Sequence, residues 1–185
     1  MAYAIGFCSR TGSAVAVAVA VEEGGPVFAG RWTVDLTGPD TPAQLFHAAA
    51  ELPPAPAEAL VRTGVTAVGE VATGRLRGLR AELGTVASVG VVTGDYPVPD
   101  SVARILASHT LMHAAEGQLY RDALLEAAVE CGLPAHGLPK HRAAALLGGD
   151  LAATVASLGA AAGPPWRKEH KLAAVAALAA LAATS

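Results

Sequence analysis

The chain has 185 residues, of which 52% are hydrophobic and 16% are charged, so its composition excludes disorder over most of the length and allows a substantial core. Thirteen basic and 16 acidic residues give a formal net charge of −3, which excludes a domain-wide basic field for nucleic acid. Two cysteines, Cys8 and Cys131, are too few for a disulfide framework.

Strand patterns fill the first 36 residues. Residues 4–8 are apolar and a tight polar turn follows them, so they predict the first arm of a hairpin. Residues 13–21 alternate Ala and Val, so both faces are apolar, which predicts a strand covered by helices on both sides. Residues 28–36 alternate apolar and polar side chains, as on a sheet edge. We expect a meander of three antiparallel strands.

Helices and strands alternate in the residues that follow. Thr41 and Pro42 predict a helix start, and the prolines of residues 52–56 predict its end. Four glycines interrupt residues 58–83, at about 1 kcal/mol each in a helix. We therefore prefer a helix to Arg62, a strand over 65–71 and a helix over 75–83 to one long helix.

The second half of the chain begins with a β-branched run at 86–92, which predicts a buried strand. Asp100 or Ser101 caps the longest predicted helix, which ends near Glu130 before a glycine and a proline. We expect a short strand at 135–138, one or two short helices and a mobile loop within 142–162, and a last helix from Trp166. The order predicts an α/β fold with a mixed sheet and helices on both faces.

Nothing in the sequence indicates export or a membrane anchor. The N-terminus has no basic segment ahead of an apolar one. The apolar run over residues 172–183 is shorter than the roughly 20 residues of a membrane span, so a buried helix explains it. We expect a cytoplasmic protein with no membrane segment and a single domain over residues 1–185.

The opening hairpin resembles the RuvC-type resolvase branch of the RNase H-like superfamily. The resemblance lies in Ile-Gly-Phe-Cys-Ser-Arg-Thr-Gly at 5–12, the helix end at 127–135 and the last helix, where Lys-Glu-His-Lys at 168–171 precedes an alanine-rich run. The resemblance implies an RNase H-like fold, in which clustered carboxylates hold one or two Mg²⁺ ions that activate water for phosphodiester cleavage.

Cys8 stands where the resemblance places the first acid, and a thiol is a poor ligand for Mg²⁺. By position, the second acid is Glu70 or Asp95 and the third is Glu169. The alternative is that these three are solvated loop and helix-start carboxylates. We expect the fold to persist with nuclease activity absent or altered.

A second constellation lies on the long predicted helix. Spacings of four and three place His109, His113 and Glu116 on one helix face, where they could bind a metal and leave positions open for water. Zinc, nickel or iron(II) suits such a ligand set. For the chain as a whole the cofactor stays open, with a divalent metal, Mg²⁺, Mn²⁺ or Zn²⁺, as the candidate. The alternative is a pair of boundary histidines that are hydrogen-bonded to Glu116 or to loops.

Local basic patches could contact nucleic acid despite the negative net charge. The densest lies at Arg62 with residues 74–80, for which the alternative is a solvated helix face, and smaller ones lie at 140–142 and 166–171. Three functions stay open. The first is a binding or scaffold module in nucleic-acid metabolism. The second is a metal-dependent hydrolase or nuclease that uses the histidine face. The third is a structural homodimer built on the alanine-rich last helix.

Overall fold

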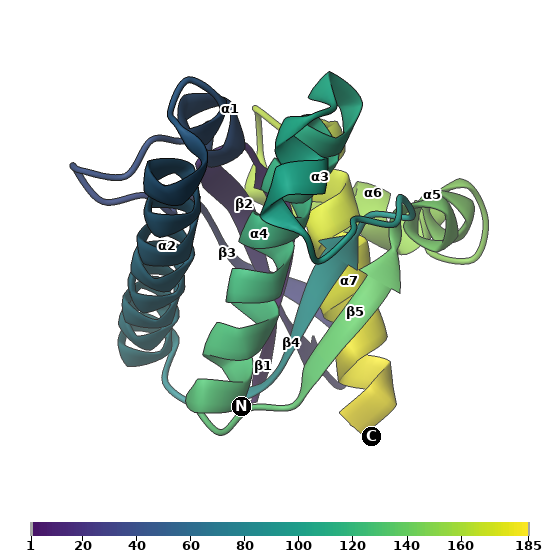
Figure 1. Ribbon diagram of the computed structural model, residues 1–185. Helices are drawn as coiled ribbons and strands as arrows, with labels where there is room; N and C mark the ends of the chain where they lie inside the picture. The colour runs from purple at the N-terminus through teal and green to yellow at the C-terminus, as the bar shows by residue number, and fades with distance from the viewer. Residues whose placement is uncertain (1, 185) are drawn as a thin grey trace.

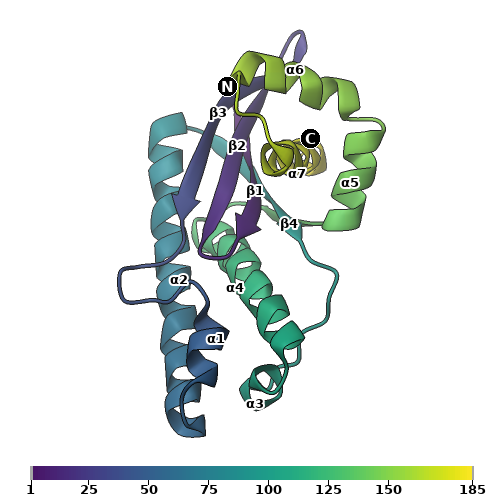
Figure 2. The same cartoon turned by 90° about the horizontal axis from the view of Figure 1, so that it is seen from above.

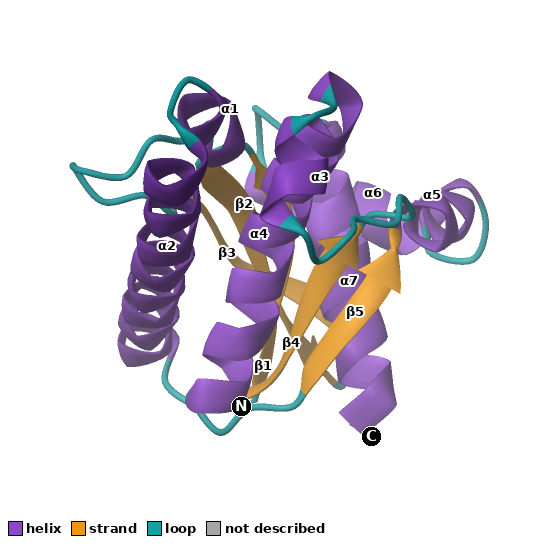
Figure 3. Ribbon diagram, viewed as in Figure 1, coloured by secondary structure: helices purple, strands orange, loops and turns teal. Residues whose placement is uncertain are grey.

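Five strands form one mixed sheet at the centre of the computed structural model, which describes residues 2–184 (Figures 1 and 3). Their spatial order is β3-β2-β1-β4-β5. The strands are β1 (Tyr3–Arg10), β2 (Ser13–Glu22), β3 (Gly25–Asp35), β4 (Val86–Thr93) and β5 (Ala135–Pro139).

The pairing of the strands confirms the predicted meander. β1 pairs antiparallel with β2, with Cys8 opposite Val15, and β2 pairs antiparallel with β3. β4 lies parallel to β1 on its other side, and β5 lies parallel to β4. Because β1, β4 and β5 run the same way, their carboxyl ends meet at one edge of the sheet.

Seven helices cover the two faces of the sheet (Figure 2). One layer, against the alanine face of β2, contains α1 (Leu45–Ala50), α2 (Pro54–Leu83), α3 (Val102–Leu106) and α4 (His109–Glu130). The other layer contains α5 (Lys140–Gly148), α6 (Ala152–Ala162) and α7 (Lys168–Thr184).

The alternation in β2 explains why helices lie on both sides. Ala14, Ala16 and Ala18 enter the core beneath α2 and α4. Val15 and Val19 enter the core beneath α7. The prediction of a strand buried on both faces is therefore confirmed, and β3 forms the partly exposed edge.

The predicted break within residues 58–83 is wrong, because α2 is one helix of 30 residues. Its buried residues recur every three or four positions, which forms an apolar stripe against the sheet and α4. Burial along this stripe outweighs the cost of the glycines. Gly64 also has a packing reason, because a Cβ there would overlap the side chain of Leu45.

Two predicted helix boundaries also need correction. The long helix predicted from Asp100 or Ser101 is divided into α3 and α4, and each part has its own serine cap. Ser101 Oγ accepts a hydrogen bond from the amide of Arg104 at 3.4 Å, and Ser108 Oγ accepts one from Leu111 at 3.4 Å. The first helix begins at Leu45 rather than at Pro42.

Helix α7 is the buried helix that the apolar run over residues 172–183 predicts. It packs on β1 and β4, where Gly6 and Gly90 are partners across the two strands. A Cβ at Gly6 would overlap the carbonyl oxygen of Ala173, and one at Gly90 would overlap that of Ala176. The apolar side chains of α7 are therefore used within the chain.

Among residues 2–184, no single helix has the length and apolar character needed to cross a membrane, although α5 and α6, bent by 87° to each other, meet that criterion as a pair.

Candidate functional site

The carboxyl ends of β1, β4 and β5 bring several predicted site residues to one edge of the sheet. β1 ends at Arg10, Asp95 follows β4, and Lys140 follows β5. The first turn of α7 joins them, because Arg10 Nη2 lies 3.2 Å from Glu169 Oε2. Glu169 thus lies near enough to the end of β1 for its charge to act on Cys8.

Cys8 is 9% exposed, and its surroundings favour the neutral thiol. Burial raises the pKa of Cys8, and the negative charge of Glu169 raises it further. The positive charges of Lys140, Arg10 and Lys168 act in the opposite direction without reversing the shift. A protonated thiol cannot replace a carboxylate as a ligand for Mg²⁺.

Glu169 is a carboxylate that already has partners. A hydrogen bond from its own backbone amide, in the first turn of α7, lowers the pKa of Glu169. Burial acts in the opposite direction, and the charge and hydrogen bond of Arg10 lower the pKa further. Its charge is therefore balanced by a helix N-terminus and a guanidinium.

The two candidates for the second acid do not join Glu169. Asp95 Oδ1 lies 3.0 Å from Nδ1 of His141, and both side chains are largely exposed. Glu70 lies on the exposed side of α2, in the other helical layer. No three His, Cys, Asp or Glu side chains at this edge, within the described part of the chain, have ligand atoms within 4.8 Å of one another. The donor set at this edge does not fit a magnesium cluster.

Cations outnumber acids around the start of α7. Arg31 is engaged in structure, since its guanidinium donates to the carbonyl oxygens of residues 163, 164 and 165 at 2.7–2.9 Å. In the described chain, no carboxylate forms an ion pair with Lys140, Arg167 or Lys168. These three cations remain available to an anionic ligand.

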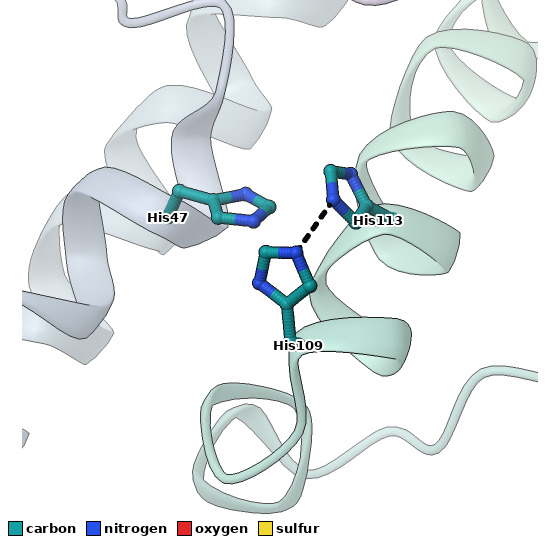
Figure 4. A group of neighbouring side chains, drawn as sticks. All are labelled: His47, His109 and His113. Atoms are coloured by element: carbon teal, nitrogen blue, oxygen red, sulfur yellow. Dashed lines mark hydrogen bonds between the residues drawn. The ribbon is translucent and has the colours of Figure 1, made fainter.

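The second candidate site is a cluster of three histidines from two helices (Figure 4). His47 lies in the last turn of α1, while His109 and His113 lie one turn apart at the start of α4. One ring nitrogen from each lies within 4.8 Å of the other two, so the three could hold a metal ion. The ring centroids are 4.5–5.0 Å apart.

Glu116 was predicted as a metal ligand, but it is not part of the three-histidine group. Its carboxylate contacts the Nδ1 side of the His47 ring instead. Glu116 is 1% exposed, and its Oε1 accepts hydrogen bonds from Nδ1 of His47 at 2.7 Å and from the His47 amide at 3.3 Å. His47 is the residue that the sequence did not reveal. A lone histidine on a short helix has no spacing that links it to α4.

Tyr120 holds the segment before α1 against α4, one turn beyond Glu116. Its hydroxyl donates to the carbonyl oxygen of Ala43 at 2.6 Å, and its side chain is fully buried. Burial, followed by the charge of Glu116, raises the pKa of Tyr120 to about 12, while the backbone of Gly12 acts in the opposite direction. The neutral hydroxyl therefore remains a donor.

No family model and no curated protein sequence matches the chain. Solved structures of RuvC do match. The structure of T. thermophilus RuvC in complex with a Holliday junction substrate superposes with a TM-score of 0.58 at 16% identity, over 96% of this chain and 91% of that one. A second Thermus thermophilus RuvC structure superposes with a TM-score of 0.58 at 17% identity, over 95% of this chain and 91% of that one.

The chain has an RNase H-like fold similar to that of RuvC.

The likeness to RuvC extends over nearly the whole chain and confirms the fold that the opening hairpin suggested. Within this RuvC-like fold, the predicted acids Glu70, Asp95 and Glu169 are not gathered into one group. Two of the three predicted metal ligands, His109 and His113, do meet, with His47 as their third member.

Proposed function

We propose that the protein is a nucleic-acid-binding module with a RuvC-like fold, in which the carboxyl edge of the sheet binds phosphates and does not cleave them through metal-activated water. The structural likeness to RuvC, which is solved in complex with a Holliday junction substrate, supports a nucleic-acid partner. Branched or single-stranded DNA is the partner class to test first.

The observation that carries this proposal is the charge around Cys8, where a thiol and nearby cations stand in place of a carboxylate cluster. A carboxylate cluster would repel phosphate without its metal ions, whereas here the thiol lies in the field of Glu169 and of the three cations Lys140, Arg10 and Lys168. Glu169 is paired with Arg10, and Asp95 at the same edge is paired with His141. Lysine and arginine side chains supply the sequence-independent part of nucleic-acid affinity by neutralising phosphates.

Because the net charge of the chain is −3, this binding is local and sensitive to salt. The direct test is fluorescence anisotropy with a labelled four-way DNA junction and a labelled single strand, between about 50 and 200 mM salt. The double variant Lys140→Ala/Lys168→Ala should weaken binding and flatten the slope of log K against log salt by about 2, since each lost phosphate contact removes roughly 0.9.

Arg77→Ala is the matched control. Arg77 is an exposed cation on α2, in the layer opposite α7, so its loss should leave the affinity close to that of the wild type. Absence of salt-sensitive binding by the wild type would overturn the proposal. A loss of binding in Arg77→Ala but not in the lysine double variant would move the contact to α2 and overturn the placement.

Cleavage is tested separately with the same DNA and added Mg²⁺ or Mn²⁺. We expect intact substrate after incubation with the wild type. Metal-dependent cleavage that Glu169→Gln abolishes would show that Glu169 serves a working nuclease site, and the non-cleaving part of the proposal would then be wrong.

A further inference from the structure

The three histidines at the α1–α4 contact include one ring nitrogen that is buried and has no hydrogen-bond partner among the described residues. Nδ1 of His47 donates to Glu116, because a carboxylate only accepts. In a neutral ring, this donation leaves the lone pair on Nε2. That Nε2 is buried and, among the described residues, has no hydrogen-bond partner. A buried nitrogen without a partner is costly unless a ligand meets it.

The other two rings face each other through their Nε2 atoms. These atoms, in His109 and His113, lie 3.1 Å apart. Two nitrogens bound to one tetrahedral Zn²⁺ at about 2.0–2.1 Å are roughly 3.3–3.4 Å apart. The two Nε2 atoms would therefore need to move only slightly to bind the same ion. Both rings are exposed, which gives an ion a path of entry from solvent.

Glu116 has the place of a carboxylate that orients metal-binding imidazoles from behind. Its Oε1 holds His47, and its Oε2 lies 4.0 Å from Nδ1 of His113, the outer nitrogen of a second ring. Such a carboxylate fixes the tautomer of a ligating histidine and increases the basicity of the nitrogen that binds the metal. Its two hydrogen bonds from His47 offset the cost of burying this carboxylate on α4.

We infer that His47, His109 and His113 bind one transition-metal ion of the Zn²⁺ class, with Glu116 as the residue that positions His47. Three imidazoles select Zn²⁺, Co²⁺, Ni²⁺ or Cu²⁺ over Mg²⁺ and Ca²⁺, which prefer oxygen ligands. The fourth coordination position is open to solvent. Because His47 belongs to α1 and the other two ligands to α4, the ion ties the two helices together.

The test is a titration of chelator-treated protein with Co²⁺ and Zn²⁺ in the absence of nucleic acid. We expect one Co²⁺ per chain with the visible absorption of a four-coordinate site, and displacement of Co²⁺ by Zn²⁺. At free Zn²⁺ about 100-fold above Kd, the Tm should rise by roughly 5–10 °C.

Single variants separate ligands from the positioning residue. His109→Ala and His113→Ala should each lose the Co²⁺ spectrum and the Zn²⁺-dependent rise in Tm, while the Tm of the metal-free protein changes little because both rings are exposed. Glu116→Gln should keep a stoichiometry of one with an affinity about 10–100-fold lower. His141→Ala, an exposed histidine on α5, is the matched control and should bind as the wild type does.

The inference is overturned if the wild type binds no stoichiometric metal, or if His109→Ala and His113→Ala bind as tightly as His141→Ala. Because the titration contains no DNA, its outcome is independent of the proposed nucleic-acid function.

Discussion

Tyr120 shows how one buried hydroxyl fixes the segment that precedes α1. Its hydroxyl donates to the carbonyl oxygen of Ala43, and the side chain has no exposed surface. Tyr120→Phe keeps the ring but leaves that carbonyl without its donor, so we expect the free energy of unfolding to fall by about 1–2 kcal/mol. Urea denaturation measures the change. Tyr96→Phe, at a side chain that is 56% exposed, should stay within about 0.5 kcal/mol of the wild type, and equal effects would contradict the prediction.

The two cysteines should differ in reactivity for the same physical reason that Cys8 is no metal ligand. Because burial and the charge of Glu169 raise the pKa of Cys8, the fold favours its neutral form, and this contribution to stability is present below the ordinary thiol pKa and lost as pH rises through the raised value. At about pH 8, a disulfide reagent should therefore modify the half-buried Cys131 well before Cys8. Mass spectrometry of digested, partly labelled protein gives the order, and faster labelling of Cys8 would refute it.

At the level of single residues, the sequence revealed what local spacing can encode. His109, His113 and Glu116 share a helix face, so their proximity follows from helical geometry. The role of Glu116 as the hydrogen-bond partner of His47 could not be predicted, because His47 comes from another helix. The charge environment of Cys8 likewise depends on which elements end at the same sheet edge.

Among the elements, α7 packs so closely on the sheet that a methyl group added at Gly6 or Gly90 would overlap its backbone. Gly6→Ala would drive a methyl group into the backbone of α7, and we expect a loss of about 1–3 kcal/mol in the free energy of unfolding. Gly69→Ala, in the open middle of α2, should instead stabilise the protein by about 0.5–1 kcal/mol. Thermal and urea unfolding measure the change in the free energy of unfolding of each variant. Changes of the same sign in the two variants would contradict the prediction.

Helix α2 also shows where prediction from the sequence met its limit. The glycine penalty is a local quantity that can be summed from the sequence, whereas the gain from burying Val61, Val68 and Leu76 depends on the surface that the rest of the chain provides. The alternation of β2 had no such ambiguity, because its apolar residues on both faces left a doubly covered strand as the consistent solution.

For the molecule as a whole, the inferred metal ion should act on one end of one helical layer. Zn²⁺ should slow hydrogen exchange of the amides in α1 and at the α3–α4 junction, because it joins His47 to His109 and His113. Amides of α6, in the helical layer on the opposite face of the sheet, should exchange at unchanged rates. Mass-spectrometric exchange with and without Zn²⁺ measures both regions, and a uniform change across the chain would contradict a local tie.

The order of elements along the chain also has a consequence for its synthesis. The valine face of β2 and the glycines Gly6 and Gly90 are covered by α7, which follows all five strands. While a ribosome is still adding residues 168–184, one apolar face of the emerging sheet is therefore exposed to solvent. Nascent chains should need shielding by chaperones until α7 leaves the exit tunnel.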